Sequence, residues 1–418
     1  MWKDLKGSVN KIVIVAALGY FVDIYDLVLF GMERVASLTD ILSKTIGDQD
    51  ELNKQVKEVG IALLNWQMFG MLVGGVFWGI LGDKKGRLSV LFGSIFMYSI
   101  ANIANAMVQD TTTYAILRFI SGFGLAGELG AGITLVSETM DKEKRGYGAT
   151  IVAAVGLFGA VVAGTVGISI GNWRVSYIIG GVMGLALLLM RIGVLESTMF
   201  KHVKESNVKK GDFFALFKTA NRFMKFITII LVALPVWYVM GILITFCPEI
   251  MSSLGMEHPP KNARLAMTLA YVGITIGDIV SGVMSQRMKS RKKSLLIFLL
   301  LAVLFIIGYF TVAGRSEFVF YTVVMLIGFA TGYWAVFMAT ASELFGTNLR
   351  ATVTTSVPNF VRGGTILITT LFQFLGGFEG IGNIKSAIIV GVIVFALGFW
   401  AWSRLEETYH KDLNYIEE

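Results

Sequence analysis

The chain has 418 residues, of which 55% are hydrophobic and 16% are charged, and its formal net charge is +7. Soluble domains carry about 25% charged residues, so the composition excludes an ordinary soluble domain and is typical of a membrane protein. The single cysteine, Cys247, excludes a disulfide framework and a cysteine-based metal cluster. The three histidines fall in expected loops or in the tail, so we expect no metal site. The basic residues lie in short loops between apolar runs, which argues against nucleic acid as a partner.

Apolar runs of about 20 residues, long enough to cross a bilayer as a helix, recur along the chain. The first, from about Lys11 to Gly31, is too long for a signal-peptide core, so we expect a retained helix. The sequence predicts twelve spans, at 11–33, 59–81, 88–108, 113–138, 147–171, 174–195, 223–250, 263–286, 293–313, 317–342, 352–376 and 384–404. Lys and Arg are concentrated in alternate loops, which predicts that both termini are cytoplasmic. The absence of an N-x-[ST] sequon fits a bacterial chain, and hence an inner-membrane protein.

The longest inner connection, 196–222, is polar and basic. It follows the sixth expected span, so it predicts a cytoplasmic linker between two six-helix halves, 1–195 and 223–418. The second half ends in a short tail that we also place in the cytoplasm. The other long connection, 34–58, has mixed charge, and we expect it to be an outer loop that is partly helical or mobile.

An internal repeat supports two related halves. Ser137-Glu138 is followed by Arg145, seven residues after the glutamate, and Ser342-Glu343 is followed by Arg350 at the same spacing. The two copies are 205 residues apart. Applied to the charged run near Asp83, the same offset reaches the basic loop after the eighth span. This regularity indicates a duplication, with the halves related by a pseudo-two-fold axis.

The most specific motif is Gly82-Asp83-Lys84-Lys85-Gly86-Arg87, a charged run between two apolar spans. Such a run must be a short loop outside the hydrocarbon, and its glycines allow a tight reversal. It resembles the loop between helices two and three of the major facilitator superfamily. This resemblance implies a twelve-helix secondary transporter that works by alternating access, with binding sites near the midplane. Six charged residues then form latches at the cytoplasmic ends that hold the outward-facing state: Asp83, Arg87, Glu138, Arg145, Glu343 and Arg350.

Ionisable residues inside spans are costly unless they are paired or hydrated, so each is a functional hypothesis. Asp23 and Asp26 share one face of the first span at i, i+3 spacing. Two carboxylates in a low dielectric suit a proton-coupling or substrate site. The alternative is that one carboxylate pairs with an arginine and only holds helices together. The stretch Gly19-Tyr-Phe-Val-Asp-Ile-Tyr-Asp-Leu27 resembles the first helix of metabolite:proton symporters and of organic-ion transporters, although Ile24 replaces their usual residue.

Span four carries Arg118 and, ten residues on, Glu128. The run from Arg118 through Gly122-Phe-Gly124 to Gly127-Glu128 resembles the same symporter group. The resemblance implies that Arg118 is a counter-charge that controls the protons on Asp23 or Asp26, while the alternative is an ion pair that packs helices. We expect Glu128, near the middle of the membrane, to act on protons or substrate.

In the second half, Arg362 lies in span eleven and Asp278 in span eight. A buried guanidinium grips a carboxylate bidentately, and the resemblance to organic-ion transporters implies that Arg362 recognises an anion. Asp278 is its expected intramolecular partner. The pair is either static, with no substrate role, or opened by a substrate carboxylate that displaces Asp278.

Six aromatic residues are candidates for the walls of the site, although an aromatic in a helix more often serves packing: Tyr25, Trp66, Trp237, Tyr238, Tyr333 and Trp334.

We therefore expect a proton-coupled symporter that imports a small organic anion or zwitterion, driven by the proton gradient without a cofactor. Its partners are protons, the substrate and the bilayer, and we expect a monomer. The alternatives are an antiporting exporter or an uncoupled facilitator, and, more remotely, a non-transporting sensor. The fifth span has no proline, unlike the drug exporters of the superfamily, which disfavours export. No nucleophile–base pair suggests an enzyme. The sequence leaves open the substrate, the direction, the stoichiometry and which carboxylate carries the proton.

Overall fold

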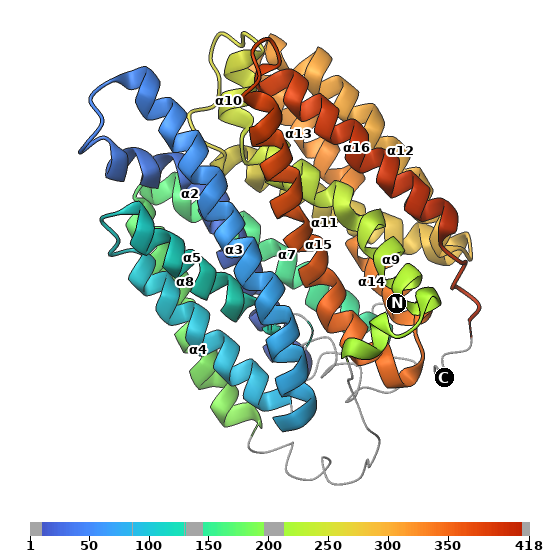
Figure 1. The fold of residues 1–418 in the computed structure, drawn as a ribbon. Helices are drawn as coiled ribbons and strands as arrows, with labels where there is room; N and C mark the ends of the chain where they lie inside the picture. The colour runs from blue at the N-terminus through green and yellow to red at the C-terminus, as the bar shows by residue number, and fades with distance from the viewer. Residues whose placement is uncertain (1–10, 86, 129, 131–144, 196–212, 412–418) are drawn as a thin grey trace.

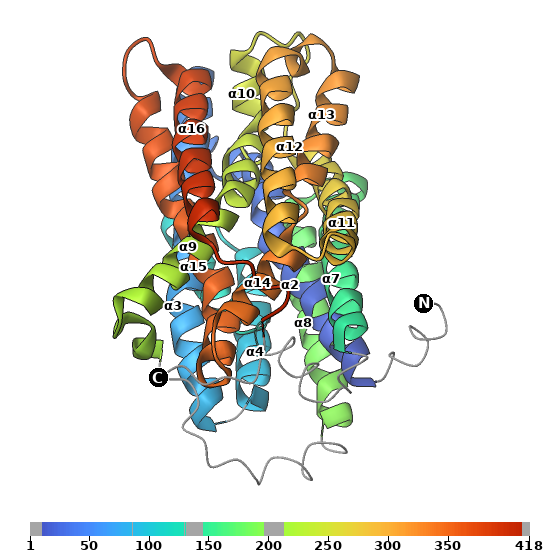
Figure 2. The same cartoon turned by 90° about the vertical axis from the view of Figure 1, so that its right-hand side faces the viewer.

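The computed structural model describes residues 11–85, 87–128, 130, 145–195 and 213–411. Across these ranges the chain is almost entirely helical, and they contain no β-strand. Figures 1 and 2 show the helices side by side in one elongated bundle, with the earlier helices, α2 to α8, beside the later ones.

The helices follow the predicted spans closely. In chain order they are α2 (Lys11–Leu42), α3 (Gln49–Lys85), α4 (Arg87–Asn105), α5 (Thr111–Leu125), α7 (Arg145–Ile170), α8 (Trp173–Leu195), η1 (Phe213–Phe217), α9 (Ala220–Tyr238), η2 (Val239–Ile244), α10 (Cys247–Ser253), α11 (Arg264–Arg287), α12 (Arg291–Thr311), η3 (Ala313–Arg315), α13 (Glu317–Thr331), α14 (Trp334–Leu344), α15 (Thr347–Gly376) and α16 (Gly382–Arg404).

The connection expected at 34–58 is mostly helical. Helix α2 continues to Leu42 and α3 begins at Gln49, so only a short turn separates them. The extension follows from burial: Arg34 and Leu38 are fully buried, and a helix satisfies the backbone of such a segment internally.

Two predicted spans are interrupted rather than continuous. In the seventh, α9 passes into the π-helical turn η2 and then into α10, and the Thr245 amide bonds to the Met240 carbonyl at 3.2 Å. In the tenth, the chain breaks between α13 and α14, at Gly332 and Tyr333. Breaks of this kind expose backbone groups at membrane depth, which is tolerated only where protein or a cavity surrounds them.

Outside the membrane-spanning cores, side chains define several helix starts. Asp110 accepts a hydrogen bond from the Thr113 amide at 2.8 Å, and Ser290 and Ser316 do the same for Lys293 and Val319. Each of these N-caps satisfies one of the amides that a helix leaves unpaired in its first turn.

Glycines allow close crossings at the centre of the bundle. A Cβ at Gly159 of α7 would collide with the Phe21 carbonyl of α2, and a Cβ at Gly273 of α11 with the Met325 carbonyl of α13. Small residues at such crossings are typical of membrane helices. Helix α2 consequently lies deep in the bundle, between α7 and α8, and also contacts α3, α5 and α11.

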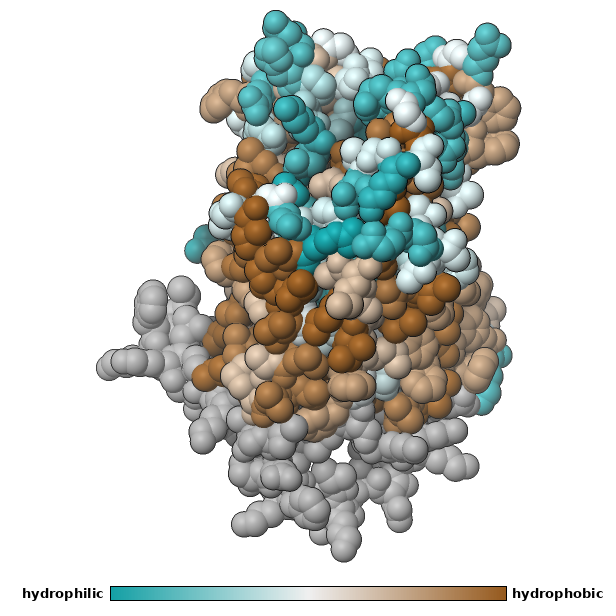
Figure 3. Space-filling view, turned by 90° about the vertical axis from the view of Figure 1, so that its left-hand side faces the viewer, coloured by the Kyte–Doolittle hydropathy of each residue, from teal (hydrophilic) through white to brown (hydrophobic). Residues whose placement is uncertain are grey.

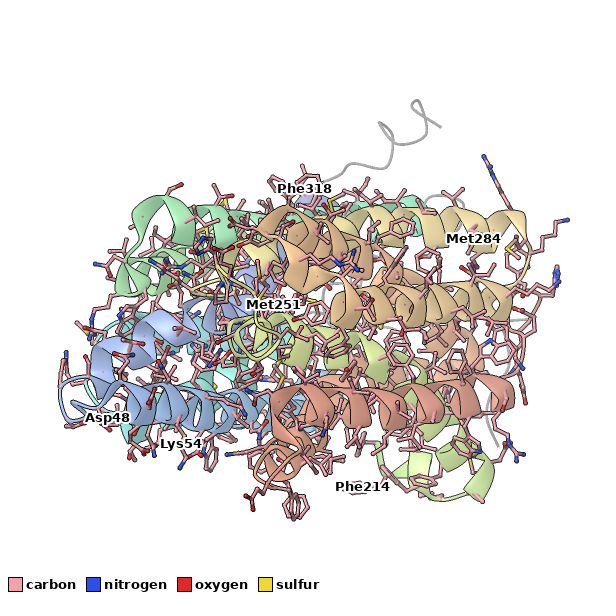
Figure 4. All side chains as sticks on the ribbon, turned by 90° about the horizontal axis from the view of Figure 1, so that it is seen from above. Asp48, Lys54, Phe214, Met251, Met284 and Phe318 are labelled. Atoms are coloured by element: carbon pink, nitrogen blue, oxygen red, sulfur yellow. The ribbon has the colours of Figure 1, made fainter. Side chains whose placement is uncertain are left out.

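The surface fits a bilayer. Nine helical segments of the described chain are long and apolar enough to cross a membrane, and large apolar side chains such as Phe158 and Leu304 are exposed on them. Figure 3 shows a broad brown zone over much of one face, with teal at one end. In Figure 4, Phe318 lies at the periphery, whereas Met251, which is fully buried, lies among the helices.

Candidate functional site

A small cavity lies where the earlier and later helices meet. It is lined from α2, α7, α9, η2, α11, α13, α14 and α15, and its volume is about 30 Å³, room for roughly two water molecules. Its aromatic and polar lining consists of Tyr20, Trp237, Tyr271, Thr331, Trp334 and Arg362. The only charged group in that lining is Arg362.

Arg362 of α15 faces Asp23 of α2 across this interface. The Arg362 Nη2 and Asp23 Oδ2 atoms are 4.0 Å apart, and both side chains are buried. At that separation the pair is electrostatic and not hydrogen-bonded. Both oxygens of Asp23 and the Nε and Nη1 atoms of Arg362 have no hydrogen-bond partner in the protein. The guanidinium therefore keeps donors with which it can bind another anion.

Asp26, one turn further along α2, is associated with a different arginine. It is attracted by Arg118 and repelled by Asp23. Arg118 is fully buried, donates from Nη2 to the Asn102 side-chain oxygen at 2.9 Å, and lies 4.9 Å from the centre of the Tyr177 ring. Asp23 repels Asp26 electrostatically, and each of the two carboxylates faces its own guanidinium.

Glu128 does not line the cavity, although its charge acts on Asp23, and it binds Arg191 of α8. The pair is bidentate: Nη1 donates to Oε2 at 3.1 Å, and Nη2 also binds Oε1. Both side chains are almost completely buried, and Arg191 also reaches the Val15 carbonyl of α2. Arg191 was not predicted as a site residue, because a charge near the end of an apolar run such as 173–195 usually belongs to the adjoining loop. Its position within that run was the available signal.

The expected pairing of Asp278 with Arg362 is wrong. Asp278 of α11 instead accepts a hydrogen bond from the Ala335 amide at 2.9 Å. Ala335 lies in the first turn of α14, whose own N-cap residue Tyr333 makes no side-chain cap. Asp278 thus caps α14 from a neighbouring helix, where its negative charge also complements the helix dipole.

Only two of the expected aromatic residues line the cavity, Trp237 and Trp334. Trp66 is 47% exposed and packs against Phe69 and Phe119, so its assignment to the cavity wall is wrong.

Three tyrosines expected in the wall join helices instead. Tyr25, Tyr238 and Tyr333 donate their hydroxyls to the carbonyls of Ser176 (3.0 Å), Ala387 (2.8 Å) and Val232 (3.0 Å). A buried tyrosine needs such a partner, and a backbone carbonyl on the adjacent helix supplies it, so these rings are not turned to the cavity.

Of the six expected cytoplasmic latch residues, only Glu343 has a described side chain. Glu138 lies outside the described residues, and the side chains of Asp83, Arg87, Arg145 and Arg350 are likewise not described. Glu343 binds Arg291 of α12, with Nη2 to Oε1 at 3.0 Å, and accepts a hydrogen bond from Thr408 at 2.6 Å.

Two ion pairs join the earlier and later helices near the other end of α2, the end predicted to face outward. Glu33 binds Arg264 of α11, and the next residue, Arg34, binds Glu249 of α10 at 2.7 Å. Arg34 also donates to the Thr245 carbonyl at 3.1 Å. We call these four residues the outer seam. The outer seam was not predicted from the sequence, although two charges that end an apolar run were a usable signal.

Comparisons with known proteins fit this architecture. The sequence profile of the Major Facilitator Superfamily matches residues 17–369. A putative metabolite transport protein of Haemophilus influenzae is 25% identical over 414 residues, which cover 95% of this chain and 90% of that protein. The 3-(3-hydroxy-phenyl)propionate transporter of Escherichia coli is 27% identical over 346 residues, 79% of this chain and 82% of that protein.

The fold is also that of a solved transporter. The crystal structure of a D-xylose-proton symporter superposes with a TM-score of 0.67 at 17% identity, over 95% of this chain and 98% of that one. At 17% identity, this similarity shows only that the two proteins share a fold. Together with the profile match over most of the sequence, it leads to one conclusion: this chain belongs to the Major Facilitator Superfamily and is a twelve-helix membrane transporter.

Proposed function

We propose that the protein is a proton-coupled symporter that imports a small organic anion, and that its preferred substrate is an aromatic carboxylate. One observation carries the proposal: a buried arginine with unused donors lies in a cavity walled by aromatic rings. Arg362 offers a bidentate site for a carboxylate, and Trp237 and Trp334 offer ring faces. A relative that is 27% identical is named a 3-(3-hydroxy-phenyl)propionate transporter, and its substrate is an aromatic carboxylate.

Asp23 supplies the connection to protons. While Asp23 is ionised, it partly neutralises Arg362 and competes with a substrate carboxylate. Protonation of Asp23 removes that competition, so the proton and the anion favour each other at the site. Asp26, beside Arg118, is the second proton-carrying candidate. Glu128 leaves this set, because its pairing with Arg191 already uses both of its oxygens.

Transport requires the cavity to enlarge and to open alternately to each side. Sites for small molecules enclose about 300–1,000 Å³, far more than the space present between these helices. We propose rocking of the halves 1–195 and 223–418 about the cavity, with the outer seam closed in the state described. The setting is a bacterial inner membrane, with the protein as a monomer and both termini in the cytoplasm.

The test begins with thermal unfolding of purified protein in the presence of benzoate, 3-(3-hydroxyphenyl)propionate, neutral benzyl alcohol and cationic choline. An aromatic acid at 100 times its dissociation constant should stabilise the wild type by about 2.7 kcal/mol. Arg362→Ala should lose this shift, whereas Arg291→Ala, which removes an arginine outside the cavity, should keep it. Stabilisation by choline alone, or an unchanged shift in Arg362→Ala, would overturn the anion site.

Coupling is then measured in proteoliposomes with the acid so identified. An inward proton gradient should drive accumulation by the wild type. Asp23→Asn and Asp26→Asn should equilibrate the acid without concentrating it. If both variants concentrate the acid as well as the wild type does, neither Asp23 nor Asp26 carries the coupled proton. If the wild type itself only equilibrates the acid, an uncoupled facilitator or an exporter is the better interpretation.

A further inference from the structure

A second polar region is buried among the earlier helices, apart from the cavity. Tyr98, Asn102 and Asn105 of α4 recur every three or four residues, and Ser99 lies three residues before Asn102, so the four form a stripe along one side of the helix. All four are fully buried. None of them lines the cavity that contains Arg362.

Neighbouring helices present polar groups or glycine to this stripe. Arg118 and Ser121 of α5 lie one turn apart, and Arg118 binds the Asn102 oxygen. On α8, a Cβ at Gly180 would touch the Asp26 carboxylate, and a Cβ at Gly184 would touch the Ser99 hydroxyl. Because Gly180 and Gly184 are one turn apart, Asp26 and Ser99 lie against successive turns of the same helix. We call these seven residues the polar cluster: Asp26, Tyr98, Ser99, Asn102, Asn105, Arg118 and Ser121.

The polar cluster is short of protein partners. Ten of its buried side-chain atoms make no hydrogen bond within 3.5 Å: both Asp26 oxygens, the hydroxyls of Tyr98, Ser99 and Ser121, the Asn102 nitrogen, both Asn105 amide atoms, and Nε and Nη1 of Arg118. The Asn102 amide lies near Asp26 and interacts with its carboxylate, and a bond between them would still leave eight atoms without a partner. Each unsatisfied buried group costs about 1–3 kcal/mol. The ten atoms belong to seven polar groups, which together would cost as much as the whole stability of a typical protein, about 5–15 kcal/mol. Something must therefore bind them.

We propose that the polar cluster binds a chain of internal water molecules that leads from Asn105 to Asp26. Water is both donor and acceptor, which the mixture of amide, hydroxyl, carboxylate and guanidinium groups requires. A metal cation is disfavoured because the Arg118 guanidinium lies within the cluster. Buried waters of this kind make two to four hydrogen bonds to groups that the protein leaves unpaired.

The water chain has a consequence that rests on the proposed symport. The Asn105 end of α4 is the end predicted to face outward, so the chain gives Asp26 a proton route that avoids the substrate cavity. A hydronium ion in bulk water gives a proton to the outermost water of the chain and is left as water. Each water then gives one of its own protons to the next, so each O–H bond that breaks is matched by one that forms, and the last proton forms an O–H bond on the Asp26 carboxylate. The groups that face Asp26 are Arg118 from α5, Asn102 and Tyr98 from α4, and Asp23 and Tyr25 on its own helix, while α8 presents Gly180.

X-ray hydroxyl-radical footprinting of the purified protein tests for the water directly. Radicals form from water and modify side chains beside it, so the Tyr98 ring should be modified rapidly despite its complete burial. Tyr309 is the matched control, because it is equally buried and its hydroxyl donates to the Leu243 carbonyl at 2.7 Å. Modification of Tyr98 no faster than that of Tyr309 would overturn the water site, whatever the protein transports.

Asn105→Leu gives a second test, with opposite results for a wet and a dry cluster. If water is bound, the leucine removes its partners, so the melting temperature falls and modification of Tyr98 slows. In a dry cluster the leucine removes two unsatisfied groups, and the melting temperature is unchanged or rises. Ser121→Ala makes the same test with a smaller change if Asn105→Leu does not fold.

In proteoliposomes, Asn105→Leu should slow proton-driven accumulation at least several-fold and leave exchange of substrate across the membrane, which needs no net proton transfer, unchanged. Rapid modification of Tyr98 with unaltered accumulation in Asn105→Leu would overturn the proton route. Loss of both accumulation and exchange would overturn it as well, because the residue would then serve the substrate path.

Discussion

The helices before residue 200 and those after it differ in how many of their buried polar side-chain atoms have a hydrogen-bond partner in the protein. In α9 to α16, the buried hydroxyls of Tyr238, Tyr309 and Tyr333 each donate to a carbonyl on a neighbouring helix. Within the described ranges, every unpartnered buried side-chain atom of these later helices belongs to α15, at Thr352, Asn359, Arg362 and Thr365. The remaining unpartnered atoms lie in α2 to α8. In the later helices the protein therefore bonds almost all buried polar side-chain atoms outside α15, whereas in the earlier helices many such atoms have no partner in the protein.

The largest expected effect concerns the buried ion pair that Glu128 and Arg191 form among the earlier helices. Arg191→Met leaves the Glu128 carboxylate buried without its cation, and breaking a buried pair costs about 3–5 kcal/mol. Thermal or denaturant unfolding of the purified variant should show this loss.

Two further variants serve as controls for this loss of stability. The double variant Glu128→Leu/Arg191→Met should recover most of the lost stability, since no charge remains unpaired. Arg291→Met, in the later helices, should lose less, because Glu343 keeps Thr408 as a partner and is 14% exposed. If Arg291→Met loses more stability than Arg191→Met, the two regions do not differ in stability as we expect.

A smaller effect should follow from Tyr309→Phe. This change removes the hydrogen bond to the Leu243 carbonyl, worth about 0.5–1.5 kcal/mol. Tyr98→Phe in the earlier helices should cost less, because waters around the lost hydroxyl can re-form bonds with one another. Chemical unfolding of both variants under the same conditions measures the unfolding free energy that each loses. Equal losses would show that the two tyrosine hydroxyls do not differ in how they are bound.

The smallest effect concerns the tail after α16. Burial raises the pKa of Glu407, but hydrogen bonds from Ser290 and from the amides of Arg291, Tyr409 and Lys292 outweigh it, so the pKa lies below its ordinary value of 4.5. A lowered pKa stabilises the folded protein above the ordinary value, and this contribution is lost as the pH falls through the folded-state value. Melting temperatures measured from about pH 6 down to pH 3 should fall less steeply in Glu407→Gln. Parallel curves would show that Glu407 titrates normally.

The sequence predicts the helices better than it predicts their partners. Long apolar runs fix the spans, and the cost of charge in a bilayer singled out Asp23, Asp26, Arg118 and Arg362, all of which are buried. Which charge meets which depends on how each helix is rotated, and one sequence does not contain that information. Arg362 therefore faces Asp23 and not Asp278. The Asp278 carboxylate instead accepts a hydrogen bond from the first turn of α14. That turn follows the break between α13 and α14, which the apolar pattern of the sequence does not predict.

The same limit explains the aromatic residues and the overlooked charges. Tyr25, Tyr238 and Tyr333 are of a residue type that often lines cavities. Each hydroxyl, however, donates to a backbone carbonyl whose position depends on tertiary packing. Glu33 and Arg34 stand at the end of an apolar run, where a charge usually marks a loop. Here the helix continues for another two turns, and the charges are turned inward to partners more than 200 residues away.

The outer seam has an electrical consequence. Glu33 and Arg34 are consecutive and opposite in sign, and they bind Arg264 and Glu249, so each wall of the seam carries no net charge. A potential of 100 mV acts with about 2.3 kcal/mol on each elementary charge that crosses the membrane. Opening the seam separates two walls that are each electrically neutral, so almost no net charge moves across the membrane. The membrane voltage therefore has little effect on the free energy of opening. The voltage can act instead on the charges that the transporter carries past the seam.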